Sequence, residues 1–448
     1  MVEQTAYDLD VWLLGEPVGM LEQRNGRLSF SYAADFIAKK TVSTGNTPNT
    51  SFFLSQSLPL RAEPFDDHAT RPFFAGLLPE GGKRKLIAQT LHVSRQNDFA
   101  LLDSLGGECA GAVTLLEPGK NPNLNLNSTL TPDPVRWLDD TQLLEVLVEM
   151  PLRPMLAGDV GLRLSLAGSQ DKLPVVLHDD GVRIGLPLYG SPSTHILKPP
   201  ISAVDGSVFN EGFCMTLASA LKLDVAKAKI HQIADQPNPR HYLLVERYDR
   251  QVATSHISTS HSKTISRVHQ EDFCQALGVA PETKYQSEGG PNLAYAFELL
   301  RRATRPSAPH TLKLLDFVVF NALIGNHDAH GKNFSLLYTD KGAVLAPLYD
   351  ALCTAVYPNL TDKMAMKIGS KYKFSEVEAK HWEQFAIDAA LSPALVKKRI
   401  VEIAKSLLNL AHATHAVFET ENNDHPIIGQ IVTLIEQRCA LTIRRLVV

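Results

Sequence analysis

The segment between residues 314 and 350 constrains the fold more than any other part of the chain, because its hydrophobic pattern changes period within a short distance. Apolar residues recur at helical spacing up to Leu323, and Gly325–Asn326 is a typical helix end. A polar loop follows at residues 327–333, and after it apolar and polar residues alternate as they do in a strand. A helix, a polar loop and a hairpin in this order predict a domain that mixes α and β structure.

Three polar residues of this segment have the chemistry that phosphoryl transfer requires. Asp328 and Asn333 lie five positions apart in the polar loop, and a turn at residues 340–342 predicts a return strand that ends at Asp350. Such a transfer needs a carboxylate for the proton of the attacking hydroxyl, oxygen ligands for Mg²⁺ and cations near the phosphates. Protein kinases place a base Asp, an Asn five residues later and a metal-binding Asp on the next hairpin in the same order. The pattern favours a kinase site, although a charged surface loop with one buried aspartate has the same short signature.

Two segments nearer the N-terminus could contribute to the same site. In RLSLAGSQDK (163–172), the small residues Ala167, Gly168 and Ser169 would let successive backbone N–H groups surround a phosphate. Lys198 ends a predicted strand just before two prolines, and an inward-facing lysine could pair with nucleotide phosphates. Taken alone, the first segment is equally typical of a hairpin turn, and the second of a solvated lysine.

The composition is that of a globular protein and argues against several other classes. The chain has 448 residues, 44% hydrophobic and 21% charged, which is enough for two or three packed units. A formal net charge of −4 does not suggest that nucleic acid binding is its main task. Five widely spaced cysteines predict neither a disulfide framework nor a zinc cage, and favour a reducing compartment. No signal peptide or membrane-spanning run is evident, so we expect a cytoplasmic protein.

Changes in composition predict three units, at residues 1–150, 151–267 and 268–448. The first combines antiparallel strands with helices, the second mixes strands around one helix as a nucleotide-covering lobe does, and helices dominate the third. The expected elements are strands within 7–32 that turn at Gly15–Glu16 and Asn25–Gly26, a broken helix from Phe73, a helix end, glycine loop and strand over 101–116, a linker at 118–134, a helix at 140–150, strands within 173–179, 182–188, 193–199 and 241–249, and a solvated loop at 251–266.

Side chains that commonly cap helices predict three helix starts. Asn210 should cap the helix of the second unit, and Ser375 with Glu378 should form a capping box in the third. Ser392 followed by Pro393 should open another helix of the third unit.

Ten segments, in order along nearly the whole chain, resemble the HipA family of serine/threonine kinase toxins. Each is short, but their shared order is specific to that family. The resemblance implies an α+β, two-lobed protein-kinase-like fold with an extra N-terminal subdomain, a mixed α/β N-terminal lobe and a mainly helical C-terminal lobe. The segments are FFAGLLPEG, GGECAGAVTL, RLSLAGSQDK, THILKPP, FNEGFCMTLASALKL, LLVERYDR, HQEDFCQALG, KYQSEGGP, IGNHDAHGKNFS and LAPLYD.

The resemblance also implies roles for individual residues. Asp328 falls on the catalytic base, Asn333 and Asp350 fall on the Mg²⁺ ligands, and Lys198 falls on the lysine that binds the ATP phosphates. As in other kinases, Glu211 would pair with Lys198. The implied ATP-binding residues are Ala167, Gly168, Ser169, Gln170, Asp171 and Lys172 of the phosphate loop, Lys198, Glu246, Arg247 and Tyr248 of the hinge, and His330, Gly331, Lys332, Asn333, Tyr349 and Asp350.

Ser165 falls on the serine that members of the family autophosphorylate and that switches them off. A phosphate at Ser165 would repel the phosphates of ATP beside it. The chain departs from the family in two places. Its catalytic loop reads HDAHGKN in place of TDGHAKN, which keeps the Asp, His, Lys and Asn but changes the loop around them. GSQDK replaces GAQEK and introduces Ser169 as a competing phosphosite.

The resemblance further implies cofactors and partners. HipA toxins use ATP and Mg²⁺, and are typically paired with a helix-turn-helix antitoxin of the HipB kind. That antitoxin binds operator DNA and holds the kinase inactive, so we expect contact with DNA mainly through it and none with a membrane. The known substrates of the family are aminoacyl-tRNA synthetases.

Two other functions are compatible with the sequence. Gly325-Asn326-His327-Asp328 matches an element of calcineurin-like metallophosphoesterases, for which Asp66–His68 could supply upstream ligands to a two-metal centre. The alternative is a nucleotide-binding pseudoenzyme that acts as a scaffold. A tightly bound dinuclear Mn or Zn centre would identify the phosphatase, and nucleotide binding without transfer would identify the pseudoenzyme.

Overall fold

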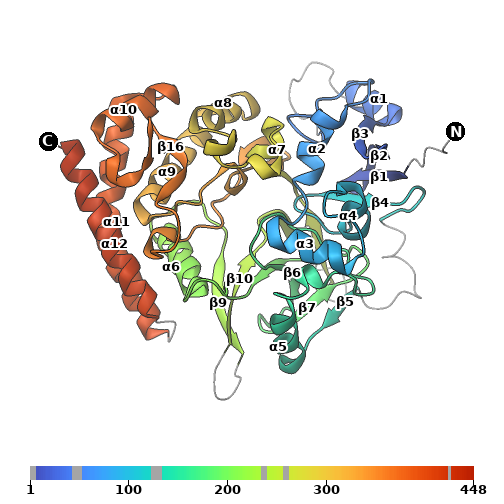
Figure 1. The fold of residues 1–448 in the computed structure, drawn as a ribbon, viewed down its shortest axis with the longest axis horizontal. Helices are drawn as coiled ribbons and strands as arrows, with labels where there is room; N and C mark the ends of the chain where they lie inside the picture. Colours follow the sequence, from blue (N-terminus) through green and yellow to red (C-terminus); the bar gives the residue numbers. More distant parts are fainter. Residues whose placement is uncertain are drawn as a thin grey trace.

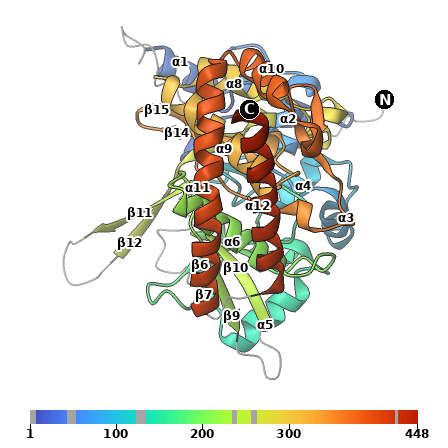
Figure 2. The same ribbon diagram turned by 90° about the vertical axis from the view of Figure 1, so that its left-hand side faces the viewer.

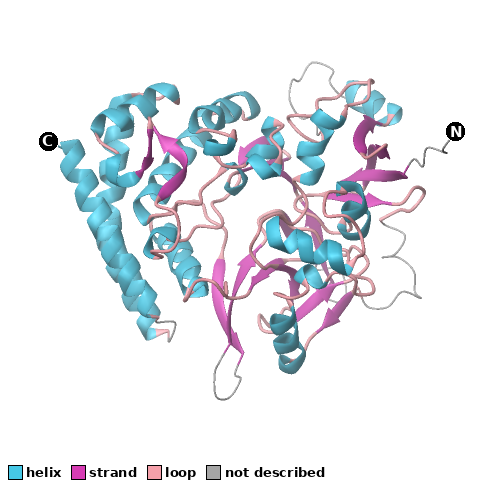
Figure 3. Ribbon diagram, in the orientation of Figure 1, coloured by secondary structure: helices cyan, strands magenta, loops and turns pink. Residues whose placement is uncertain are grey.

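The computed structural model describes residues 7–42, 53–122, 134–233, 240–255, 262–421 and 425–447. From the N-terminus, the chain forms a four-stranded sheet with helices, then a six-stranded sheet, and then a helical body that ends in two long helices (Figure 1). Strands concentrate on the N-terminal side and helices on the C-terminal side, as Figure 3 shows. The protein therefore has an α+β fold.

The N-terminal sheet has the strand order β3-β2-β1-β4. Its second hairpin turns at Asn25–Gly26, as predicted, where both residues have the positive φ that such turns need. The first turns at Leu14–Gly15, one residue earlier than expected, and Glu16 already belongs to β2. The broken helix expected from Phe73 is two helices, of which the second begins at the glycines. The elements are β1 (Tyr7–Leu13), β2 (Glu16–Arg24), β3 (Arg27–Tyr32), α1 (Ala34–Val42), α2 (Asp67–Ala75), α3 (Gly81–Thr90), α4 (Asp98–Leu105) and β4 (Val113–Leu116).

The six-stranded sheet has the order β5-β7-β6-β8-β10-β9. Its four expected strands are present, while the edge strand β9 was not predicted. The strand β5 precedes residue 150 yet pairs with β7, and residues 123–133 of the expected linker lie outside the described residues. The elements are β5 (Val135–Trp137), α5 (Asp140–Glu149), β6 (Leu173–Leu177), β7 (Ile184–Pro187), β8 (His195–Lys198), α6 (Ser207–Ala220), β9 (Ala228–Ile233) and β10 (Arg240–Glu246).

The helix α6 begins one turn before the predicted cap. Asn210 is fully buried inside the helix, where its amide bonds to the backbone N–H and C=O of Cys353 at 2.7 and 2.9 Å. The capping prediction was wrong because this tertiary contact, not the helix end, uses the asparagine side chain.

The solvated loop expected at residues 251–266 is largely a hairpin. The strands β11 (Arg250–Ser255) and β12 (Ser262–Arg267) pair antiparallel and project from the body of the molecule (Figure 2). Residues 256–261 lie outside the described residues.

The C-terminal body is mainly helical, as expected. The antiparallel helices α11 and α12 pack against each other and against α6 and α9 (Figure 2). Ser392 caps α11 as predicted, whereas α10 is capped by Glu378 with His381, and Ser375 lies in the preceding 3₁₀ turn. The elements are β13 (His269–Asp272), α7 (Phe273–Leu277), α8 (Leu293–Ala303), α9 (Ala308–Ile324), β14 (Ser335–Thr339), β15 (Gly342–Leu345), β16 (Lys363–Ile368), β17 (Lys371–Lys373), α10 (Ala379–Asp388), α11 (Pro393–Thr420) and α12 (Pro426–Val447).

Two hydrophobic cores underlie this arrangement. One core packs the N-terminal sheet and its helices against one face of the six-stranded sheet. The other packs α6, which covers the opposite face, against the C-terminal body. All five cysteines are buried and free, as the sequence predicts. None of the helices within the described residues has the length and hydrophobicity needed to cross a lipid bilayer.

Candidate active site

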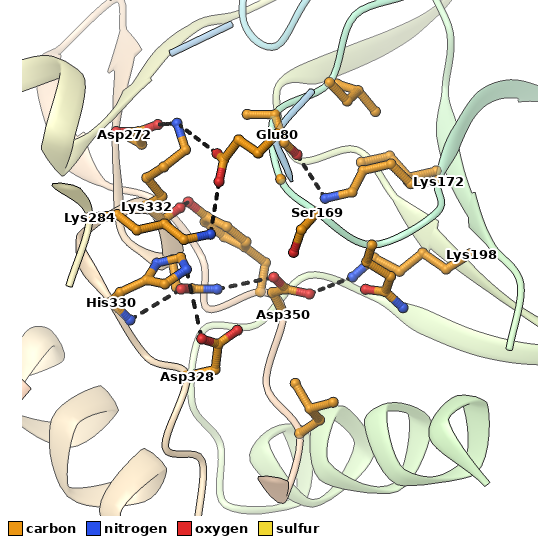
Figure 4. A pocket seen from close by; sticks show the side chains of 18 of the residues that line it. Glu80, Ser169, Lys172, Lys198, Asp272, Lys284, Asp328, His330, Lys332 and Asp350 are labelled. Carbon is orange, nitrogen blue, oxygen red and sulfur yellow. Dashed lines mark hydrogen bonds and ion pairs between the residues drawn. The ribbon is translucent and has the colours of Figure 1, made fainter. Parts of the chain in front are cut away.

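A cavity of about 560 Å³ lies where the predicted phosphate loop (residues 167–172), β8, β10 and the loop after α9 meet (Figure 4). Most of the predicted site residues line it. Asp171 does not, because it forms an ion pair with Lys83 at 2.6 Å, and neither Gly331 nor Ser165 reaches the cavity surface. The predicted residues that line the cavity are Ala167, Gly168, Ser169, Gln170, Lys172, Lys198, Glu246, Arg247, Tyr248, Asp328, His330, Lys332, Asn333, Tyr349 and Asp350.

Asp328 is placed by the end of α9. Gly325, with φ of 80°, terminates the helix, and a Cβ at this position would lie 2.8 Å from the Cβ of Ala355. The Asn326 side chain then accepts a hydrogen bond from the Asp328 N–H at 3.1 Å, which fixes the start of the loop. The Asp328 side chain is 47% exposed and faces the cavity (Figure 4). Burial by the surrounding protein raises its pKa, which makes the carboxylate a better proton acceptor.

Asn333 and Asp350 lie side by side in the cavity. The Asn333 amide donates to Asp350 Oδ2 at 3.0 Å. The sequence predicts Asp350 at the end of a strand, but it lies five residues beyond the end of β15. Its φ of 56° is strained for a residue with a side chain. Burial alone would raise the pKa of Asp350, but Lys198 and Lys172 hold it below its usual range. The strained backbone therefore presents an ionised carboxylate to the cavity.

Lys198 connects the two lobes at this point. Its ammonium group lies 2.6 Å from Glu211 Oε1 on α6 and 2.7 Å from Asp350 Oδ1, so the pair predicted between Lys198 and Glu211 is present. Burial opposes a charged lysine, but the two carboxylates raise the pKa of Lys198 and keep it protonated. A fixed cation thus lies next to the ionised Asp350.

The phosphate loop closes on itself beside these residues. Lys172 Nζ donates to the Ala167 carbonyl at 2.8 Å, and the Glu80 N–H donates to the Gly168 carbonyl at 3.0 Å. Gly168 has a φ of 108°, which favours glycine. Burial lowers the pKa of Lys172, the only direction in which burial can move a lysine.

The two serines of this loop are exposed to different degrees. Ser165 is fully buried, and its hydroxyl donates to the Leu77 carbonyl at 2.8 Å, whereas Ser169 is exposed at the cavity. A phosphate on Ser165 has no room in this conformation, so the loop would have to move.

His330 and Lys332, two further polar residues of the loop at 327–333, point in different directions. Lys332 pairs with Asp272 at 2.7 Å and with Glu80 at 3.6 Å, away from Asp350. The Nε2 atom of His330 lies 4.0 Å from Asp328 Oδ1. Burial lowers the pKa of His330 well below its usual value, so the ring is neutral.

The predicted hinge is held by a buried ion network. Glu108, which is fully buried, pairs with Arg247 at 3.1 Å, Arg250 at 2.7 Å and Arg267 at 2.6 Å. The Arg247 guanidinium also bonds to Asp249 and to the Cys109 carbonyl, so its charged end is directed toward the N-terminal subdomain. The network fixes the backbone on either side of Tyr248, the middle residue of the predicted hinge.

Three charged or polar cavity residues that bond to one another or to Asp328 have no role assigned from the sequence. Glu80, Lys284 and Tyr285 lie in two of the ten segments, FFAGLLPEG and KYQSEGGP, but their spacing carries no signal of a site. Lys284 pairs with Glu80 at 2.8 Å, and the Tyr285 hydroxyl donates to Asp328 Oδ1 at 2.5 Å. These contacts join segments that are far apart in the sequence.

The geometry gives no support to a two-metal phosphatase. His327 borders the cavity, but its Nδ1 bonds with the Thr361 carbonyl at 3.0 Å, and Asp66 caps α2 through the Ala69 N–H. Within the described ranges, no group of three or more His, Cys, Asp or Glu side chains is arranged to hold a metal ion.

Comparisons with known proteins show which family the chain resembles. The HipA-like C-terminal domain family matches residues 164–411, and the HipA N-terminal domain family matches residues 9–116. The Sinorhizobium fredii protein Y4mE, whose name describes a kinase, is 46% identical over 400 residues, 89% of each chain. The serine/threonine-protein kinase toxin HipA of Shewanella oneidensis is 28% identical over 393 residues, 85% of each chain.

A solved structure resembles the whole fold. It is the Shewanella oneidensis HipA in a complex with HipB and operator DNA, which matches with a TM-score of 0.77 at 24% identity and covers 97% of both chains. This match confirms the expected α+β, kinase-like fold.

Proposed function

The chain belongs to the HipA family, and from this premise we propose that it is a serine/threonine protein kinase that uses Mg-ATP. The observation that carries the proposal is the convergence of Asp328, Asn333, Asp350 and Lys198 on one cavity. The three polar groups lie up to 22 residues apart in the sequence, and Lys198 comes from the other lobe. A phosphoryl-transfer site needs these groups together, whereas a scaffold does not.

In this proposal, each side chain has one task. Asp328 accepts the proton of the acceptor hydroxyl, because its carboxylate faces the cavity and its pKa is raised by burial. Lys198, held by Glu211, contacts the phosphates of ATP. The apolar side chains Leu166, Ile196, Ala226 and Val245 line the cavity and would receive the adenine, with Tyr248 at the hinge.

The residues present also fit a magnesium ion. Asn333 Nδ2 lies 3.0 Å from Asp350 Oδ2, and Asn333 Oδ1 accepts from the His330 N–H at 3.2 Å. The amide would therefore turn to offer its oxygen beside Asp350, whose carboxylate is held ionised. Oxygen groups of this kind suit Mg²⁺, with phosphate oxygens and waters completing the shell. When bound, the ion would neutralise charge on the transferred phosphate.

The family resemblance supports a more specific proposal for partners. We propose an aminoacyl-tRNA synthetase as the protein substrate and a HipB-like helix-turn-helix antitoxin as the inhibitor, in the cytoplasm. Contact with operator DNA would then be made mainly through the antitoxin, which fits the net charge of −4.

The direct test is incubation of the purified chain with γ-labelled ATP, Mg²⁺ and a panel of purified aminoacyl-tRNA synthetases. Mass spectrometry should find one synthetase phosphorylated on a serine or threonine, in a reaction that EDTA stops. Binding of ATP without transfer to any protein, itself included, would support the pseudoenzyme and contradict the proposal.

A second prediction follows from the proposal that Ser165 is the autophosphorylation site. After incubation with Mg-ATP, the intact mass of the wild-type chain should increase by one phosphate, and that of Ser165→Ala should not change. Kinase activity should decline as the phosphate appears, because the buried Ser165 hydroxyl cannot be modified without displacing the loop. Ser169→Ala is the matched control, since Ser169 is the exposed serine of the same loop. Phosphate that persists in Ser165→Ala and disappears in Ser169→Ala would assign the site to Ser169.

A further inference from the structure

A tyrosine outside the catalytic loop is bonded directly to the proposed base. The Tyr285 hydroxyl donates to Asp328 Oδ1 at 2.5 Å, a short distance typical of O–H donors to carboxylates. Tyr285 lies 43 residues earlier in the chain, in the segment between α7 and α8. The contact is therefore a tertiary feature of the site and not a consequence of the catalytic-loop sequence.

The segment that carries Tyr285 is tied down on both sides. Its neighbour Lys284 pairs with Glu80 at 2.8 Å, which anchors it to the N-terminal subdomain. The Tyr285 carbonyl accepts hydrogen bonds from the N–H groups of Glu288 and Gly290, both at 2.9 Å. A Cβ on Gly290 would lie 2.2 Å from the Thr283 carbonyl, so only glycine closes this turn. The backbone that carries the Tyr285 ring is thus anchored on both sides.

The aromatic ring of Tyr285 also packs against a second neighbour of Asp328. Tyr285 packs edge-on against His330 with ring centroids 5.1 Å apart, and His330 Nε2 lies 4.0 Å from the same Asp328 Oδ1. Among the described residues, none donates a hydrogen bond to Asp328 Oδ2. Tyr285 and His330 therefore both lie next to Oδ1 of Asp328, and Oδ2 is left available to the cavity.

We propose that Tyr285 is a positioning residue of the catalytic base: it fixes Oδ1 of Asp328 so that Oδ2 takes the proton of the acceptor hydroxyl. The inference rests on the proposed kinase function and adds the element that orients its base. The acceptor needs no displacement of Tyr285, and the phenol keeps its own proton throughout.

The charges around Asp328 give this arrangement a signature in pH. Burial raises the pKa of Asp328, the Tyr285 hydrogen bond and Lys284 lower it, and Asp350 and Glu80 raise it, while His330 is neutral. Removing the phenolic O–H takes away a donor that favours the ionised carboxylate. The pKa of Asp328 should therefore rise further, and a larger fraction of the base should be protonated at a given pH.

The test compares the pH dependence of kcat in the wild type, Tyr285→Phe and Tyr295→Phe. Tyr295 is 60% exposed on α8 and serves as the matched control. Tyr285→Phe should lower kcat about 10-fold near neutral pH, because a hydrogen bond to a charged group is lost. Its KM for ATP should be unchanged, and the acidic limb of its kcat profile should move to higher pH.

A second variant keeps the ring and strengthens the bond. Difluorotyrosine incorporated at position 285 has a more acidic phenol, so the acidic limb should move to lower pH than in the wild type. This variant preserves the shape of the side chain and covers the case in which Tyr285→Phe does not fold.

The outcomes separate the inference from the proposed function. A wild-type chain that transfers no phosphate contradicts the kinase proposal itself. An active wild type, an inactive Asp328→Asn and a Tyr285→Phe with wild-type kcat and acidic limb overturn the positioning role alone. A Tyr285→Phe that loses activity equally at every pH, with a lower melting temperature, also overturns it, since a purely structural contact would behave in this way.

Discussion

Replacing Asp328 with asparagine should lower the rate of phosphoryl transfer about 10²- to 10⁴-fold, the loss typical of removing a general base. The amide is nearly isosteric with the carboxylate but cannot accept the proton of the attacking hydroxyl. ATP affinity should not weaken, because the groups proposed to hold the phosphates and Mg²⁺ (Lys198, Asn333 and Asp350) bond to one another and not to Asp328. Single-turnover transfer from labelled ATP, with nucleotide binding measured by calorimetry, separates the two effects.

Asp340→Asn is the matched control for this variant. Asp340 is exposed at the turn between β14 and β15, close to the catalytic loop in sequence but outside the cavity lining. The control should keep wild-type transfer. An Asp328→Asn variant that retains more than about a tenth of the wild-type rate would remove Asp328 from the role of base, since such a small loss is below that expected for general-base catalysis.

The loop at residues 327–333 could be predicted from sequence because its signals are local. The helical period ending at Gly325, the polar loop with Asp328 and Asn333, and the alternation after it all lie within a few residues of the side chains they position. It was harder to predict that Lys198 and Asp350 belong to one site, because they lie 152 positions apart and spacing alone does not show that they meet. The hairpin and the strand end suggested Asp350 and Lys198 as candidates, the family resemblance gave each a role, and the structure places both in one cavity.

The residues that sequence reasoning missed act through distant partners. Tyr285 meets a residue 43 positions away, Lys284 meets Glu80 across 204 positions, and Glu108 meets Arg267 across 159. No periodicity or short motif encodes such pairs. They were contained in the segments that suggested the family, but the reason for their presence there is visible only in three dimensions.

Local signals also failed where a tertiary contact competed for the same side chain. Asn210 has the chemistry of a helix cap but bonds to Cys353 from inside α6. The Ser/Thr/His-rich composition of residues 251–266 is typical of a loop, yet alternating residues such as Val252 and Ile265 pair across the hairpin of β11 and β12. In both cases the preference was real but weaker than long-range pairing.

Replacing Glu108 with glutamine should destabilise the protein by roughly 3–5 kcal/mol, the range for removing one partner of a buried ion pair. The carboxylate is fully buried and balances Arg247, Arg250 and Arg267, two of which are themselves buried. Glutamine keeps the shape but leaves these guanidinium groups with Asp249 as their remaining buried counter-charge. Urea unfolding should show the loss as a lower midpoint, and the KM for ATP should rise because the network flanks the hinge at Tyr248.

The pH dependence of stability tests the same network in the wild type. Three arginines offset the cost of burial and hold the pKa of Glu108 at about 2, below its usual value near 4.5. A lowered pKa means that the stabilisation is complete above about pH 4.5 and is lost as the pH falls toward 2. Glu108→Gln should lack this part of the acid sensitivity. The exposed pair of Glu117 with Lys120 gives the control, since Glu117→Gln should cost less than about 1 kcal/mol. A similarly small loss for Glu108→Gln would show that the arginines find other partners and that the network does not hold the hinge.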